Sequence, residues 1–338
     1  MSCRIVGCRR KNRQVRKDGI EPTMRIVLLL LVIQFALSAL AQGTGTASEP
    51  ESQEVARSAT LASQDLESPF LQGDLQLLVG NVQRPNGFVW HDGSLYTICN
   101  GDWTIYKIDD RTGDTITFVF GTRDGNTLIL EETLAGFDIW VPDPESGALW
   151  KVDQRRAAPA AITTELEAPW GITRLDDSQF LVTDTRVNGI AAVGEDGQRR
   201  EVHSELRAPT GIVKHENRIY FANGGSARRG IEYFTLEGAG AYSSVKPLVS
   251  GLQNTTNLAL GSDGKLYFAY ALGTRGVIGR IDPTICLDAG CSGDDVELVV
   301  FSDIPAPLAI TLSDDLRLFL HSRFRPEIYW LQLPLEST

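Results

Sequence analysis

Short runs of alternating apolar and polar residues, separated by turns rich in Gly, Asp and Asn, recur from residue 75 to residue 333. Their period of two and their content of Val, Ile, Phe, Tyr and Thr predict β-strands, and no stretch has a helical period. Six runs open alike, and their openings are 40, 44, 40, 46 and 52 residues apart. The equivalent positions are Gly87, Thr127, Gly171, Gly211, Asn257 and Ala309. This spacing of short strands predicts an all-β, six-bladed β-propeller.

The first repeat can be divided into four strands, whereas the sixth ends at Leu333, before an outer strand could form. An outer-strand sequence without a blade of its own lies near the other end of the chain. This segment, Leu75–Gly80 (LQLLVG), resembles Lys246–Gly251 (KPLVSG), which precedes the fifth repeat. We therefore expect the N-terminal strand 75–80 to join the last blade and close the ring, which removes the exposed sheet edges.

The first 41 residues have the pattern of an export signal. A basic region, residues 1–23, precedes an apolar run from Ile26 to Ala41 that ends in Ala39-Leu40-Ala41, the small-x-small pattern of signal peptidase sites. A retained membrane anchor is the alternative, because the run approaches the length that spans a bilayer. Residues 42–70 are rich in Ser, Thr, Ala and Glu and predict a disordered linker. The propeller is therefore assigned to residues 71–338, and a secreted or periplasmic location is expected.

The net charge of the chain argues against nucleic acids and anionic membranes as partners. Residues 1–41 contain eight Lys/Arg and two Asp/Glu, so the rest of the chain has 24 basic and 41 acidic residues and a formal net charge of −17. Such an acidic surface repels nucleic acids and anionic membranes. We therefore expect no nucleic-acid partner, no membrane contact beyond the export signal, and a monomer.

Two of the five cysteines point to a disulfide. Cys286 and Cys291 bracket Leu-Asp-Ala-Gly inside the longest repeat, and in an exported protein this spacing predicts a local bridge. Two unpaired loop thiols are the alternative. Cys99 follows a strand pattern and is expected to be a small buried apolar residue.

Several motifs resemble a known group of propellers. The Pro-x-Gly-Ile openings at 169–172 and 209–212, the strand ending at 181–185 and the Arg-Ile-Asp-Pro sequence at 280–283 carry this resemblance. Over residues 75–333 the chain resembles the six-bladed propellers of the broad NHL, SMP-30 (gluconolactonase) and strictosidine-synthase-like group. Because these motifs serve turns and strand packing, the resemblance implies the architecture rather than an activity.

In such a ring, the loops that precede the inner strands and those that join second to third strands lie on one face, around the mouth of the channel. We call this the loop face, and it is the default ligand site. Blades 4 to 6 bring basic side chains to it, whereas blades 1 to 3 bring carboxylates such as Asp102 and Asp184. Guanidinium groups bind carboxylates in pairs of hydrogen bonds, so the pattern predicts a cradle for a small or extended anionic ligand. The alternative is that each arginine pairs with a local carboxylate. The candidate residues are Arg228, Arg275, Arg323, Arg325, Trp170 and Asp102.

The resemblance also implies a possible cation. Lactonases of this group hold calcium on the channel axis with a Glu, two Asn and an Asp, and such oxygen ligands suit that ion. The candidates here are Asn86, Asn126, Asp184, Asn223 and Asn257. Arg84 stands where the Glu is expected, however, and Asn and Asp also cap turns in propellers that bind no ion. Ca²⁺ is thus an open alternative.

Three functional hypotheses follow. The first is an exported propeller that binds an anionic ligand at the loop face of the central channel. The second is a metal-dependent hydrolase or lactonase of the SMP-30 kind, with His321 and Asp184 as the candidate catalytic residues, and the third is a protein-interaction scaffold. The missing axial Glu favours the first over the second. The sequence contains no Ser/His/Asp arrangement, phosphate loop or dinucleotide fingerprint.

Overall fold

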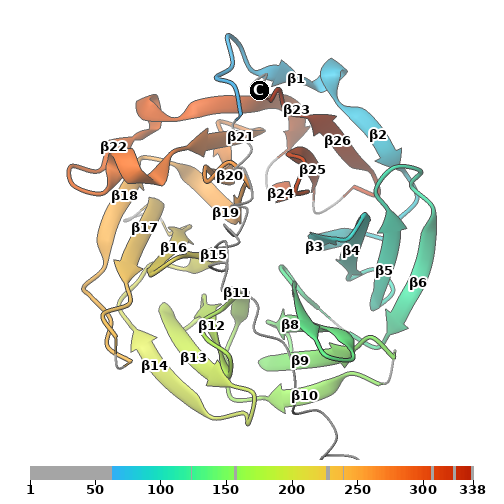
Figure 1. Cartoon of the computed structure of the whole chain (residues 1–338), viewed down its shortest axis with the longest axis vertical. Coiled ribbons are helices and arrows are strands. Elements are labelled where there is room, and N and C mark those ends of the chain that lie inside the picture. Colours follow the sequence, from blue (N-terminus) through green and yellow to red (C-terminus); the bar gives the residue numbers. More distant parts are fainter. Residues whose placement is uncertain are drawn as a thin grey trace, which may run out of the picture. The chain divides into compact units, whose positions relative to one another are not determined.

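A computed structural model describes residues 63–122, 124–155, 158–225, 229–238, 240–305, 308–322 and 325–335. In these residues, six mainly antiparallel sheets are arranged in a ring, so the predicted six-bladed β-propeller is confirmed (Figure 1). The export signal and most of the predicted linker lie outside the described residues.

The first three blades follow one another along the chain, each with four antiparallel strands. From the inner strand outward, blade 1 contains β3 (Pro85–His91), β4 (Ser94–Cys99), β5 (Thr104–Asp109) and β6 (Thr115–Phe120). Blade 2 contains β7 (Ile129–Thr133), β8 (Gly136–Asp143), β9 (Ala148–Asp153) and β10 (Ala160–Thr163). Blade 3 contains β11 (Pro169–Arg174), β12 (Gln179–Asp184), β13 (Gly189–Gly194) and β14 (Arg199–His203).

The other three blades include strands that are distant in sequence. The main strands of blade 4 are β15 (Pro209–His215), β16 (Arg218–Asn223), β17 (Gly230–Thr235) and β18 (Lys246–Ser250). Those of blade 5 are β19 (Gln253–Leu260), β20 (Leu266–Leu272), β21 (Arg275–Ile281) and β23 (Glu297–Pro305). Those of blade 6 are β24 (Leu308–Leu312), β25 (Arg317–Ser322), β26 (Ile328–Gln332) and β2 (Gln76–Val79). Gln76 of β2 pairs with Trp330 of β26, so the outer strand of blade 6 comes from the N-terminal side of the chain.

Glycines in the openings allow neighbouring inner strands to approach closely around the channel. A Cβ atom on Gly171 would lie 2.3 Å from the carbonyl oxygen of Thr210, and one on Gly211 would lie 2.8 Å from the amide nitrogen of Leu258. Both contacts are shorter than real Cβ atoms tolerate. The Pro-x-Gly-Ile repeat therefore reflects the packing of one blade against the next.

Apolar side chains of adjacent blades pack together between the sheets. Trp140 of blade 2 is fully buried and lies over Phe180 of blade 3, with the ring centroids 4.2 Å apart. Cys99 is buried and unpaired in the cluster between blades 6 and 1, and its burial raises the pKa of the thiol. Interfaces of this kind stabilise each blade through its neighbours.

Residues 63–71, here called the strap, contact the last two blades. Phe70–Leu71 forms β1, which pairs in parallel with β23 of blade 5. At the start of the strap, Ser63 forms a bridge with Leu335, and the Gln64 amide donates to the Pro334 carbonyl at 3.1 Å. A 3₁₀ helix, η2 (Gln72–Asp74), then leads into β2. Ser63 to Phe70 thus contact the propeller, although they belong to the segment whose composition indicates a linker.

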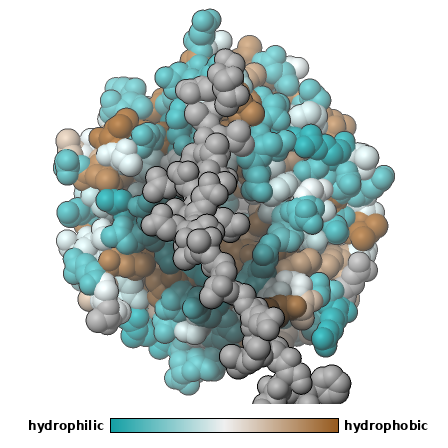
Figure 2. Space-filling model, viewed as in Figure 1, coloured by the Kyte–Doolittle hydropathy of each residue, from teal (hydrophilic) through white to brown (hydrophobic). Residues whose placement is uncertain are grey.

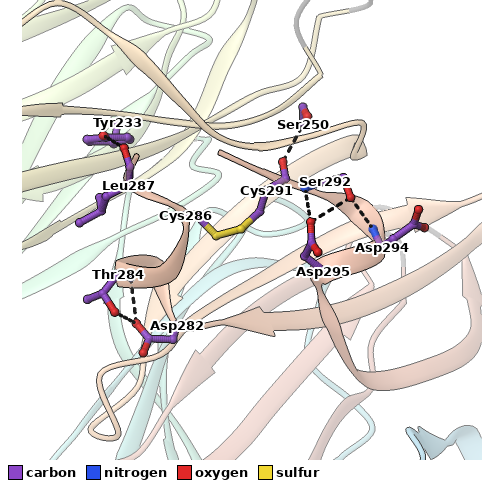
Figure 3. Close-up of a disulfide and its surroundings, with 10 residues drawn as sticks. All are labelled: Tyr233, Ser250, Asp282, Thr284, Cys286, Leu287, Cys291, Ser292, Asp294 and Asp295. Carbon is purple, nitrogen blue, oxygen red and sulfur yellow. Dashed lines mark hydrogen bonds between the residues drawn. A yellow bond between two sulfur atoms is a disulfide. The ribbon is translucent and has the colours of Figure 1, made fainter. Parts of the chain in front are cut away.

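The longest repeat contains an insertion between β21 and β23, and the predicted disulfide links two residues within this insertion. Cys286 and Cys291 are bonded between η3 (Pro283–Cys286) and η4 (Gly293–Asp295) (Figure 3). Cys291–Ser292 forms β22, which pairs in parallel with β18 of blade 4, and the Ser250 hydroxyl donates to the Cys291 carbonyl at 3.2 Å. The insertion of blade 5 therefore extends the sheet of blade 4.

The face of the ring drawn in Figure 2 is largely hydrophilic, with apolar residues in small separate groups. Within the described part of the chain, none of the helices has the length and apolar character needed to cross a membrane.

Candidate ligand-binding site

Most of the side chains that line the central channel are apolar. Its cavity of about 250 Å³ is lined by residues from the inner strands of all six blades, and the polar side chains among them are three threonines and one asparagine. The polar residues are Thr127, Thr173, Asn257 and Thr311. None of these wall residues has a charged side chain that could pair with an anionic ligand.

A ring of hydrogen bonds joins each blade to the next around the channel, and most of the predicted axial residues belong to it. Asn86 Nδ2 donates to the Gly125 carbonyl at 2.6 Å, Thr127 Oγ1 to the Trp170 carbonyl at 2.7 Å and Thr210 Oγ1 to the Thr255 carbonyl at 2.9 Å. Asn86 Nδ2 also lies 3.2 Å from Asn126 Oδ1. The remaining links are Thr183 Oγ1 to the Thr210 carbonyl at 2.6 Å and the Ile310 amide to Asn257 Oδ1 at 3.2 Å.

His321 completes this ring between blades 6 and 1. Its side chain is fully buried, its Nε2 atom contacts the Asn86 carbonyl oxygen, and its ring lies 4.9 Å from that of Phe88. A carbonyl oxygen can only accept, so Nε2 carries the proton. The contacts of His321 link two blades rather than face a ligand.

Of the five candidate calcium ligands, Asn86 and Asn126 lie within hydrogen-bond distance of each other, whereas Asp184 and Asn223 bind backbone amides of nearby loops. The Asp184 carboxylate accepts from the amides of Glu167 at 2.7 Å, Ala168 at 3.1 Å and two residues of its own loop, Arg186 and Val187, at 3.1 and 3.4 Å. Asn223 accepts from the Arg207 amide at 3.1 Å and donates to Glu232 at 2.5 Å. Among the described residues, no three His, Cys, Asp or Glu side chains are grouped closely enough to hold a metal ion. The side-chain oxygens of Asp184 thus hold two loops together.

Asp102 and Trp170 lie in different blades and have local partners. The Tyr106 hydroxyl donates to Asp102 Oδ2 at 2.5 Å, and this hydrogen bond raises the pKa of Tyr106 to about 12. Asp102 and Trp170 are both half-buried, and the Trp170 carbonyl is part of the inter-blade ring. Neither residue is among the walls of the pocket that Arg325 lines.

Two of the four predicted arginines can be placed, because Arg228 and Arg323 lie outside the described residues. Arg275 begins β21, its Nη1 atom is 3.3 Å from Asp303 Oδ1, and its guanidinium lies over the Phe301 ring at 5.1 Å. Arg325 follows β25, and its amide donates to the Ser322 carbonyl at 3.0 Å. Arg275 therefore has the local carboxylate partner that the alternative interpretation predicts.

Arg325 lines a pocket between blades 5 and 6, here called the blade 5/6 pocket. Its cavity of about 170 Å³ lies where β23 and β25 end and β26 begins. These strand ends are level with the start of the inner strand β24, since Leu308 pairs with Ser322, so the pocket is on the loop face. The walls are Gln72, Asp303, Ile304, Ser322, Arg325, Glu327 and Tyr329.

The charges of this pocket are only partly paired. Among the described residues, no carboxylate lies within salt-bridge distance of the Arg325 guanidinium, although Glu327 lines the same cavity. Burial raises the pKa of Tyr329, and the charge of nearby Glu327 contributes to this shift. Gln72 Oε1 is buried and accepts no hydrogen bond from any residue the structure describes. The pocket therefore presents a guanidinium group without a salt-bridge partner beside acceptors that no described residue uses.

Sequence patterns identify Arg325 but not its neighbours. Gln72 comes from η2, Asp303 from the end of β23, and Glu327 and Tyr329 from the last blade. The one available signal was the expected pairing of residues 75–80 with the last blade, which brings residue 72 near that blade. The position of Gln72 directly after β1 could not be inferred, because residues 63–71 have no strand-like pattern.

Comparisons with known proteins support the fold. Among solved structures, the chain is similar to a streptogramin B lyase, with 16% identity, a TM-score of 0.53 and coverage of 81% of this chain and 97% of that one. A gluconolactonase from Xanthomonas campestris has 14% identity and a TM-score of 0.59, with 77% and 89% covered. The nidogen/laminin complex contains a chain with 15% identity and a TM-score of 0.55, with 70% and 89% covered.

Neither protein-family models nor curated proteins match this sequence. The structural matches include a gluconolactonase, as the resemblance in the sequence predicts, and they establish the propeller fold alone. Their activities differ from one another, so the activity of this chain has to be argued from its own side chains.

Proposed function

We propose that this protein is an exported β-propeller that binds a small ligand with an anionic group at the loop face, in the blade 5/6 pocket. The observation that carries the proposal is the position of Arg325. Its guanidinium lines a cavity and has no carboxylate partner among the described residues. Guanidinium groups bind carboxylates and phosphates through paired hydrogen bonds, so an anionic group on a ligand is the natural partner.

Surrounding contacts support a site on the rim rather than on the channel axis. Arg275 pairs with Asp303, a wall of the same pocket, so a second predicted arginine lies near the pocket. The channel, by contrast, is lined mainly by apolar side chains and by residues of the inter-blade ring. A ligand at the rim can bind without breaking that ring.

Export is supported by the apolar run 26–41 and by the disulfide Cys286–Cys291. Disulfides persist in secreted and periplasmic proteins and are rare in reducing compartments. The calcium-dependent lactonase hypothesis requires its oxygen ligands to gather on the axis. Asp184, its acidic member, accepts from four backbone amides instead, which favours binding without a metal.

A binding titration with matched arginine variants tests the proposal. Isobutyrate, a small carboxylate, is titrated into the purified protein at constant ionic strength and its affinity is measured by NMR line broadening or calorimetry. Because Arg325 is exposed, we expect Arg325→Ala to weaken binding about three- to tenfold. The control is Arg186→Ala, an exposed loop-face arginine 3.6 Å from Glu167, which should leave the affinity unchanged. Equal affinity of the wild type and Arg325→Ala, or no saturable binding, would overturn the proposal.

A further inference from the structure

We propose that the blade 5/6 pocket recognises a small zwitterion, with its carboxylate at Arg325 and its ammonium group between Asp303 and Glu327. This inference rests on the proposed binding of an anionic group at Arg325 and adds a second recognition element. The expected ligands are molecules that carry an ammonium group and a carboxylate a few bonds apart, such as free amino acids and their derivatives.

The charges of the walls favour this class over a simple anion. Among the walls, Arg325 carries a positive charge and Asp303 and Glu327 carry negative charges, and Arg275, which does not line the cavity, pairs with Asp303. A ligand with no net charge leaves this balance intact, whereas a simple anion would lie beside carboxylates that repel it. The mixture of signs is therefore better matched by a zwitterion.

The two carboxylates retain acceptors for an ammonium group. Asp303 uses Oδ1 for Arg275, at 3.3 Å, and Asp303 Oδ2 has no partner among the residues the structure describes. Within the same residues, the Glu327 carboxylate forms no hydrogen bond or salt bridge although its side chain is half-buried. Unused carboxylate oxygens on pocket walls are suited to a cationic donor.

A third acceptor comes from the strap side of the pocket. Gln72 Oε1 is buried and has no donor among the described residues. A buried acceptor without a partner is costly, and a ligand that donates to it removes that cost. An ammonium group carries three N–H donors, which matches the oxygens of Asp303, Glu327 and Gln72.

The size of the pocket limits the ligand. Its volume of about 170 Å³ is smaller than the ~300–1,000 Å³ of sites for drug-sized molecules. Ile304 and the Tyr329 ring supply the apolar part of the wall, which can contact a short aliphatic side chain. A compact molecule with two charged groups is therefore expected, rather than an extended polymer.

Three probes of similar shape measure the contributions of the ammonium group and the carboxylate to binding separately. L-Alanine carries both; isobutyrate replaces the ammonium group with a methyl group; and L-alaninamide replaces the carboxylate with a neutral amide. We expect L-alanine to bind about three- to tenfold more tightly than either analogue, because each analogue loses one charge-assisted contact to a partly exposed group. Glu327→Gln should reduce the advantage of L-alanine over isobutyrate without weakening isobutyrate, while Arg325→Ala should weaken both.

The outcomes distinguish this inference from the proposed function. If isobutyrate binds as tightly as L-alanine and depends on Arg325, the anion site stands and the zwitterion inference is wrong. If L-alaninamide binds most tightly, or if none of the three probes gives saturable binding, both proposals are wrong. Thermal unfolding of each variant, expected to match the wild type because these side chains lie outside the blade cores, shows that a loss of binding does not reflect misfolding.

Discussion

Arg280 Nη1 donates a hydrogen bond of 2.9 Å to Ser63 Oγ, across 217 residues of sequence, and both residues are buried. The same guanidinium binds Glu297 through Nε at 2.7 Å and Nη2 at 2.8 Å, and Nη2 also contacts the Gln64 carbonyl. Glu297 in turn accepts from the Leu66 amide at 2.6 Å. One buried arginine of blade 5 thus anchors the strap that leads to the outer strand of blade 6.

This anchor predicts that the strap stabilises the ring. A chain that begins at Gln72 should unfold several degrees lower than a chain that begins at Ser63, because Arg280 and Glu297 lose partners and β23 loses β1. Removal of part of a buried ionic network typically costs about 3–5 kcal/mol, and the exposed part of this network argues for the lower end of that range. Thermal unfolding monitored by circular dichroism measures the difference.

Ser63→Ala tests the same anchor with a single substitution. It removes the hydroxyl that accepts from Arg280 and donates to Asp263 at 2.5 Å, and it keeps the strap backbone. It should cost about 1–3 kcal/mol. Equal melting temperatures for the two truncated chains would show that the strap contributes nothing to stability.

The disulfide should act mainly on the local insertion. Its cysteines are five residues apart, so the loop-closure relation gives roughly 2 kcal/mol or less of stabilisation. In Cys286→Ser/Cys291→Ser, the melting temperature should fall by only a few degrees, whereas amide exchange in β22 and at the end of β18 should speed up, because β22 pairs there through Cys291 and Ser292. Hydrogen exchange with mass spectrometry checks this, and unchanged exchange in these peptides would contradict it.

His203 predicts a dependence of stability on pH. Burial lowers the pKa of His203, whose ring lies 4.5 Å from that of Phe234 in the folded state. The unfolded chain therefore takes up the proton first as the pH falls. The contribution of His203 is complete above the unfolded pKa of about 6.5 and is lost as the pH drops through the lower folded value.

A comparison of variants isolates this effect. Between pH 7.5 and pH 5, the wild type should lose stability relative to His203→Phe, which keeps a ring beside Phe234 and does not titrate. His215→Phe, at the last residue of β15, serves as the histidine control. If the difference in melting temperature between wild type and His203→Phe is the same at both pH values, the assignment is wrong.

The repeat could be recognised from sequence because its glycines have a local physical cause. Gly87, Gly171 and Gly211 stand where the backbone of the next inner strand leaves no room for a Cβ atom, so glycine recurs at three of the six equivalent positions. The strand alternation and the disulfide are likewise local patterns. They predicted the blades and the pairing of Cys286 with Cys291.

The roles of individual polar residues were harder to predict, because they depend on partners in other blades. His321 and Asn86 are 235 residues apart in sequence and in contact in the structure, and the sequence alone does not distinguish such a link from a ligand site. The strap was missed for a related reason. Its polar composition indicates a linker, yet Arg280 supplies buried partners for its first residues.

The central claim is that a carboxylate binds beside Arg325 rather than in the channel. Backbone amide chemical shifts recorded during a titration with L-alanine or isobutyrate locate the site directly. We expect saturable shifts in and around the blade 5/6 pocket, at Gln72, Ser322, Glu327 and Tyr329, and none at the channel residues Thr127 and Asn257. Shifts centred on the channel residues, or no saturable shift at the pocket, would contradict the account.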